Sequence, residues 1–126
     1  MSNAVVFAYS SVGVECLSVL LRHGVNISLV YTHEDDPNEV HWFKSVYDLA
    51  KSHNLNVRTD EPDFSVVQAA KPDVIFSFYY RSMIDMKILG LAPLGAFNMH
   101  GSLLPKYRGR ACVNWAVLNG ETQAGV

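Results

Sequence analysis

The chain has 126 residues, which is enough for one domain with its own core and too few for two. A hydrophobic share of 49% and a charged share of 17% exclude the disordered class. Ten basic and twelve acidic side chains give a formal net charge of −2, so the overall charge attracts neither nucleic acid nor an anionic membrane. Cys16 and Cys112 have no metal-ligand or redox spacing, and no apolar run approaches the ~18 residues of a membrane span. We therefore expect a soluble cytoplasmic protein without a metal site.

Strand and helix patterns alternate along the chain. Apolar runs rich in β-branched and aromatic residues predict buried strands, and apolar residues at helical spacing predict helices. Asp36, Pro37 and Glu39 have the pattern of a helix cap, so the second helix is predicted to begin there. The predicted strands are residues 4–9, 27–32, 55–58, 74–80 and a strand that begins near 95; the predicted helices are residues 12–24, 37–50, 64–70 and 86–91.

This alternation implies right-handed crossovers and an α/β fold, with a doubly wound, mostly parallel sheet. The run 74–80 is the most apolar and is predicted to lie in the middle of the sheet. The link after the first strand contains one glycine, Gly13. It therefore lacks the glycine pattern of dinucleotide sites and P-loops, and a nicotinamide or Walker-type enzyme is not expected.

Residues 95–110 are where we place the chemistry. Asn98 and His100 are two positions apart on the predicted strand, so both side chains are expected on the same face. An amide can hold developing oxyanion charge while an imidazole moves protons, a combination that suits acyl-type transfer. We expect this strand near the centre of the sheet, with both side chains at the mouth of a pocket shared with residues 81–84.

Two other groups of residues have alternative interpretations. Lys106, Arg108 and Arg110 are either a solvated basic loop or a clamp for a carboxylate or phosphate, and their nearness to Asn98 favours the clamp. His33 and His41 lack a second ligand at metal spacing and are interpreted as solvated surface residues.

Residues 97–109 read Phe-Asn-Met-His-Gly-Ser-Leu-Leu-Pro-Lys-Tyr-Arg-Gly, which closely resembles the signature of the folate-dependent formyltransferases. The resemblance implies the Rossmann-like formyltransferase fold and transfer of a formyl group from 10-formyltetrahydrofolate to a primary amine. It implies that Asn98 stabilises the oxyanion and that His100 is the acid/base. The residues implied on the folate side are Ser82, Met83, Ile84 and Arg110.

Residues 76–81, 108–110 and 114–115 look most like the formyltransferase domain of the bifunctional polymyxin-resistance enzymes of lipid A modification. That branch formylates UDP-4-amino-4-deoxy-L-arabinose, so the implied acceptor is a 4-amino sugar nucleotide. Methionyl-tRNA formyltransferase is an alternative, although the net negative charge weighs against tRNA. A non-catalytic module that binds folate or a nucleotide is the alternative outside the enzyme class.

The chain departs from the family pattern at several points. Ser82 stands where the family usually has His, and Cys112 stands where it usually has Pro. The aspartate that orients the family's histidine has no match before Val126, and the second domain is missing, so residues 1–126 are interpreted as an incomplete N-terminal formyltransferase domain. We expect this chain alone to bind folate weakly, to transfer little formyl group and to be able to self-associate through a strand left without a neighbour.

Overall fold

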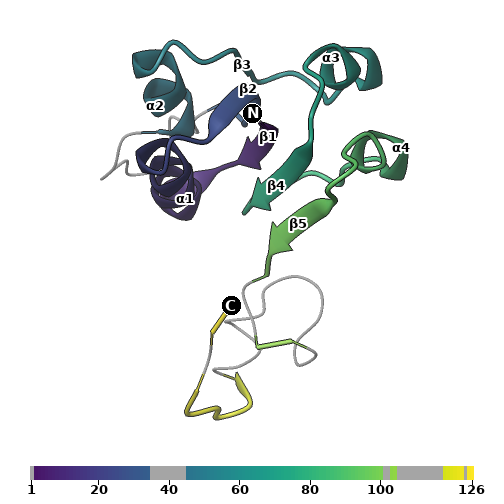
Figure 1. The fold of residues 1–126 in the computed structure, drawn as a ribbon. Coiled ribbons are helices and arrows are strands. Elements are labelled where there is room, and N and C mark those ends of the chain that lie inside the picture. Colours follow the sequence, from purple (N-terminus) through teal and green to yellow (C-terminus); the bar gives the residue numbers. More distant parts are fainter. Residues whose placement is uncertain (1, 35–44, 101–102, 105–117, 124) are drawn as a thin grey trace.

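The computed structural model describes residues 2–34, 45–100, 103–104, 118–123 and 125–126. They form one parallel five-stranded sheet in the order β3-β2-β1-β4-β5, which confirms the expected α/β doubly wound fold (Figure 1). The strands are β1 (Asn3–Ala8), β2 (Asn26–Tyr31), β3 (Val57–Arg58), β4 (Val74–Phe78) and β5 (Ala96–Met99). The helices are α1 (Ser10–Arg22), α2 (Val46–Ser52), α3 (Phe64–Ala69) and α4 (Met86–Leu89). In this part of the chain no helix is long and apolar enough to cross a membrane.

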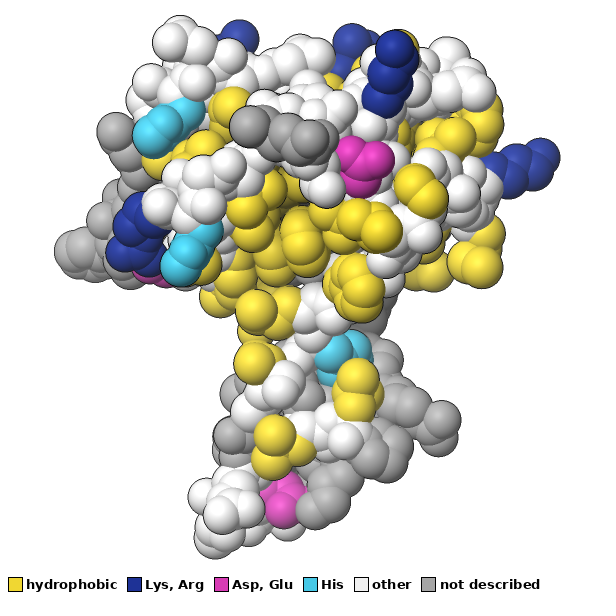
Figure 2. Space-filling view, in the orientation of Figure 1, with side chains coloured by type: hydrophobic (Ala, Val, Ile, Leu, Met, Phe, Trp, Pro, Cys, Tyr) yellow, Lys and Arg dark blue, Asp and Glu magenta, His cyan; other side chains and the backbone are white. Residues whose placement is uncertain are grey.

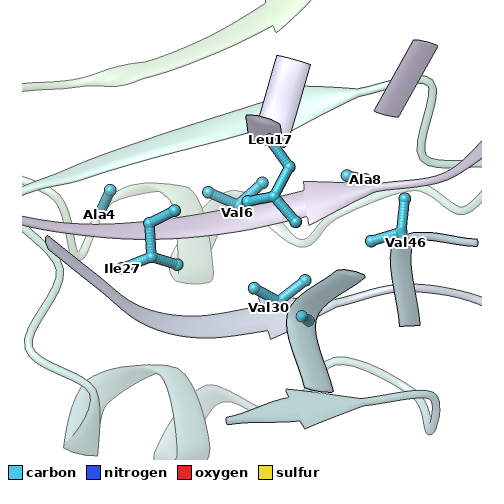
Figure 3. Packing of buried hydrophobic residues seen from close by; sticks show 8 residues of the cluster. Ala4, Val6, Ala8, Leu17, Ile27, Val30 and Val46 are labelled. Carbon is cyan, nitrogen blue, oxygen red and sulfur yellow. The ribbon is translucent and has the colours of Figure 1, made fainter. Parts of the chain in front are cut away.

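Helices α1 and α2 cover one face of the sheet. Leu17 of α1 and Val46 of α2 pack against alternate residues of β1 and β2, among them Val6 and Val30 (Figure 3). Leu17, Val6 and Val30 have no exposed surface. Because full burial of such a side chain is worth roughly 1.5–3 kcal/mol, this face contributes a large part of the core.

Helices α3 and α4 cover the opposite face. Val67 of α3 and Ile88 of α4 join a second buried cluster with Phe7, Tyr31 and Ile75 of the strands. The rings of Phe7 and Tyr31 stack with their centroids 5.2 Å apart. The sheet is therefore buried on both sides, which explains why β1 is a continuous apolar run from Ala4 and why β2 is mostly apolar.

One continuous helix over residues 37–50, as predicted, is contradicted at Ser45. Ser45 has an extended backbone with ψ 160°, so α2 begins at Val46 and cannot run on from Pro37. The Ser45 hydroxyl accepts a hydrogen bond from the Asp48 N–H at 3.0 Å, which caps the helix at this point. Asp36 and Pro37 lie outside the described residues. Val46 and Ala50 of the predicted apolar stripe are buried, as expected.

The expected place of the Asn98 strand is also wrong. In the described sheet β1 is central, and β5 lies at the edge beside β4. β1 occupies one side of β4, and β5 pairs with the other side. The run that contains β4 does lie inside the sheet, as predicted.

Candidate active site

The carboxyl ends of the parallel strands meet at one edge of the sheet. Strand order reverses between β1 and β4, because the chain adds β2 and β3 on one side of β1 and β4 and β5 on the other. Ligands of open α/β sheets bind outside the carboxyl ends of the strands near such a reversal. The segments after β1, β2, β4 and β5 are therefore the candidates for a functional site.

Asn98 lies near the carboxyl end of β5. It pairs with Ser77 of β4 and is exposed. Paired residues of parallel strands point to the same face, so Asn98 shares the face of Ser77, on which α4 packs. This position leaves the carboxamide accessible from a cavity rather than enclosed in the core.

A cavity of about 270 Å³ lies between β4, β5, α4 and the segment that follows β4. Asn98 lines it together with Ser82, Met83 and Ile84, three residues that the family resemblance implies on the folate side. Ser82 and Ile84 are half-buried, whereas Met83 is 88% exposed. The predicted pocket shared by Asn98 and the segment after β4 is therefore present. The remaining lining residues are Ile75, Ser77, Tyr80, Leu89, Ala96 and Phe97.

His100 borders a different cavity. This second cavity, of about 680 Å³, is lined by Asn98 and His100 and by apolar residues that include Phe78, Met99 and Leu103. Asn98 lines both cavities, but His100 does not line the one that contains Ser82 to Ile84. Strand β5 ends at Met99, so strand alternation does not extend to His100, and the expectation that both side chains share a face stays a prediction. Arg110, Cys112 and the basic residues Lys106 and Arg108 lie outside the described residues.

The other face of β5 is apolar. Phe97 and Met99 pair with Phe76 and Phe78 of β4, and the Cys16 thiol of α1 donates a weak hydrogen bond to the Met99 sulfur at 4.0 Å. Burial, and to a lesser degree Glu15, raise the pKa of the Cys16 thiol, so it stays protonated. Figure 2 shows hydrophobic side chains gathered over β4 and β5. On this face β5 packs against β4 and contacts α1.

A cluster that the sequence analysis missed lies where β1, β2 and β4 end. His33, interpreted from the sequence as a solvated surface residue, stacks on Tyr80 with ring centroids 4.3 Å apart and meets Tyr9 edge-on at 5.2 Å. The Arg81 N–H donates to His33 Nε2 at 2.9 Å, and the Arg81 guanidinium lies 4.6 Å from the centre of the Tyr9 ring. The correction has a structural cause: the contacts of His33 come from strands that are neighbours only in space.

The described residues contain no group of three or more His, Cys, Asp or Glu side chains placed to hold a metal ion. His41 lies outside them. The His33 ring stacks on Tyr80, and its Nε2 atom accepts the hydrogen bond from the Arg81 N–H. Its surroundings are those of a hydrogen-bonded imidazole in an aromatic cluster.

The family model for formyl transferases matches residues 4–126. Among solved structures, the glycinamide ribonucleotide transformylases of Geobacillus kaustophilus and Symbiobacterium toebii are similar, each with 20% identity, at TM-scores of 0.75 and 0.76. They align over 98% and 99% of this chain and over 71% and 63% of their own lengths. WlaRD, a sugar 3N-formyl transferase whose structure was determined with dTDP and 5-N-formyl-THF, aligns at 21% identity and a TM-score of 0.70, over 98% of this chain and 44% of its own.

The phosphoribosylglycinamide formyltransferase of Bacillus halodurans is also similar, and the alignment covers 66% of its length. This chain therefore spans about two-thirds or less of the length of several of these proteins. At these identities the structures show the shared fold. The family model covers nearly all of the 126 residues, including the Asn98 strand and the segment after β4. The chain belongs to the formyl transferase family.

Proposed function

We propose that this chain carries the catalytic part of a folate-dependent N-formyltransferase. The observation that supports this most directly is that Asn98, at the end of β5, lines the same cavity as Ser82, Met83 and Ile84. An amide donor at a strand end, beside a partly apolar cavity, suits a reaction in which negative charge develops on a carbonyl oxygen. The proposed donor of the formyl group is 10-formyltetrahydrofolate.

The cavity is compatible with the ring end of a folate. Drug-sized ligands occupy cavities of roughly 300–1,000 Å³, and a volume of about 270 Å³ suits part of such a molecule. Ile75, Ile84 and Leu89 supply apolar walls, while Ser77 and Ser82 supply hydroxyl groups for hydrogen bonds. Aromatic and aliphatic walls with a few polar groups are the usual composition of such sites.

The proposed chemistry assigns one task to each of two side chains. The acceptor amine attacks the formyl carbon of the bound donor, and the Asn98 amide donates a hydrogen bond to the formyl oxygen as it gains negative charge. His100 takes the proton that the amine loses and returns it to the departing nitrogen of the folate. The products are the formylated amine and tetrahydrofolate.

For the acceptor we propose a 4-amino sugar nucleotide. Residues 76–81 resemble the polymyxin-resistance branch, and WlaRD is a sugar formyl transferase with a similar fold. The net charge of −2 disfavours a tRNA acceptor, because nucleic-acid binding depends mainly on neutralising phosphates. Competition between UDP-4-amino-4-deoxy-L-arabinose, glycinamide ribonucleotide and methionyl-tRNA in one assay would show which acceptor is used.

The first prediction tests Asn98. In the full protein, Asn98→Ala should lower kcat for formyl transfer by about a hundredfold or more, the usual effect of losing one oxyanion donor, and leave folate affinity and folding largely unchanged. Asn56→Ala is the matched control, because Asn56 is an exposed asparagine just before β3, at the opposite edge of the sheet. Near-normal turnover by Asn98→Ala would show that the oxyanion is held elsewhere. Folate binding without transfer to any acceptor, in the unmutated protein, would favour a non-catalytic module.

A further inference from the structure

His33 connects three strands at their carboxyl ends. It lies two residues after the end of β2, Tyr9 directly follows β1, and Tyr80 lies two residues after β4. The His33 ring is placed between Tyr9, which it meets edge-on at an interplanar angle of 79°, and Tyr80, on which it stacks at 17°. Tyr80 in turn meets the buried Phe7 edge-on, with centroids 5.3 Å apart. His33 is thus fixed through aromatic contacts to the core of the sheet.

The hydrogen bond from Arg81 fixes the protonation state of this ring. Nε2 accepts the Arg81 N–H at 2.9 Å, so it carries a lone pair, and the imidazole is neutral with its proton on Nδ1. Burial first, and then the Arg81 charge, lower the pKa of His33, while Glu61 acts in the opposite direction. Among the described residues these are the charged groups that act on the ring, and burial raises the pKa of the neighbouring Tyr80 to about 12, so Tyr80 stays uncharged. At neutral pH the ring is therefore an acceptor.

The segment held by His33 is the wall of the candidate folate cavity. Tyr79 has a φ of 59°, a left-handed conformation that a bulky side chain rarely adopts without support from its surroundings. Immediately after this turn, His33 contacts both the Tyr80 ring and the Arg81 backbone. Tyr80, Ser82 and Ile84 then line the cavity that Asn98 also lines.

We propose that His33 is a positioning residue that holds residues 80–84 in place for the folate-binding cavity by accepting the Arg81 N–H and stacking on Tyr80. Its role lies in the geometry of the segment, since His33 is not among the residues that line the cavity. The proposal rests on the proposed function for the nature of the ligand. It makes folate affinity depend on the neutral imidazole.

The test compares His33→Phe, which keeps a stacking ring but has no acceptor, with His33→Gln, which keeps an acceptor oxygen. The measurement is the affinity of the full protein for 5-formyltetrahydrofolate by calorimetry between about pH 5 and pH 8. At pH 8, His33→Phe should bind about three- to tenfold more weakly, the effect of one lost hydrogen bond, and His33→Gln should recover part of the loss. The unmutated protein should weaken toward the His33→Phe level as the pH falls, while His33→Phe shows no such change. His53→Gln, an exposed histidine at the end of α2, is the control.

A second measurement does not depend on folate. Hydrogen exchange of the Arg81 amide, followed by NMR, should be about tenfold faster in His33→Phe than in the unmutated protein, because its acceptor is gone. Equal exchange rates, or equal folate affinity and pH dependence in the two proteins, would overturn the proposal. If the unmutated protein binds no folate, the proposed function fails, and the Arg81 exchange rate alone decides whether His33 holds the segment. Circular dichroism shows whether each variant folds. If His33→Phe does not fold, His33→Gln is compared with the unmutated protein instead.

Discussion

The neutral state of His33 also affects how stability depends on pH. Its pKa in the folded protein is lowered from the ordinary 6.5, mainly by burial and by Arg81. The unfolded chain therefore takes up a proton at a higher pH than the folded one, so the stabilisation by His33 is complete above about pH 6.5 and is lost as the pH falls through the folded value. The advantage of the unmutated protein over His33→Gln in free energy of unfolding should be largest at pH 7 to 8 and should shrink toward pH 5, as measured by urea denaturation. A difference that does not vary with pH would contradict this assignment.

Two residues show what the sequence could and could not indicate at this scale. Asn98 could be predicted, because a polar side chain near the end of an apolar strand is visible in the chain itself, and the structure places it beside Ser82 to Ile84. The role of His33 could not be predicted, because Arg81 is 48 positions away and the contact exists only because β2 and β4 both flank β1. Local patterns carry no information about such pairs.

Among the elements, α1 approaches the sheet unusually closely at Gly13. A Cβ atom placed on Gly13 would lie 3.1 Å from a Val46 methyl group and 3.2–3.3 Å from Ala8 atoms, one of them backbone. Alanine is favoured over glycine in a helix by roughly 1 kcal/mol, but overpacking costs about 1–3 kcal/mol. We expect Gly13→Ala to lower the free energy of unfolding by about 1 kcal/mol in chemical denaturation, because the Ala8 backbone cannot move aside.

The control for this substitution is Gly90, at the end of α4. A Cβ there would be no closer than 3.4 Å to its neighbours, and its φ of −68° suits alanine. Gly90→Ala should therefore leave stability unchanged or raise it slightly. If both substitutions changed the free energy of unfolding equally, the close contact of α1 with β1 and α2 would not be the reason that residue 13 is glycine.

The elements themselves were largely predictable, and their exceptions have local causes. The strands β1, β2 and β4 are mostly apolar, as a sheet buried on both faces requires. The start of α2 was missed because Ser45 caps it, and a serine inside an apolar stripe gives a weaker signal than the Asp36 and Pro37 pattern before it. The edge position of β5 depends on strand order, which periodicity does not report.

At the scale of the whole molecule, the strand order places the Asn98 cavity and the His33 cluster next to each other around the reversal point. The cavity at Asn98 is built by β4, β5 and α4, whereas the His33 cluster draws on β1, β2 and β4. Strand β4 is common to both, so the four residues after Phe78 link the aromatic cluster to the cavity. Alternation of strands and helices predicted this class of fold, but only the order of the strands brings the two groups together.

The last prediction concerns the outer side of β5. Within the described residues β5 pairs only with β4, and two large hydrophobic residues near this edge, Leu94 and Phe97, are 62% and 57% exposed. Unpaired backbone groups beside exposed apolar side chains favour pairing with another chain, so we expect the 126-residue chain to self-associate as its concentration rises. Sedimentation velocity should show this, and Phe97→Lys should weaken it, because a charge on an edge strand opposes pairing. Phe64→Lys, at a 42% exposed position on α3, should have no effect. A monomer at every concentration would mean that the edge of β5 is not available to a second copy.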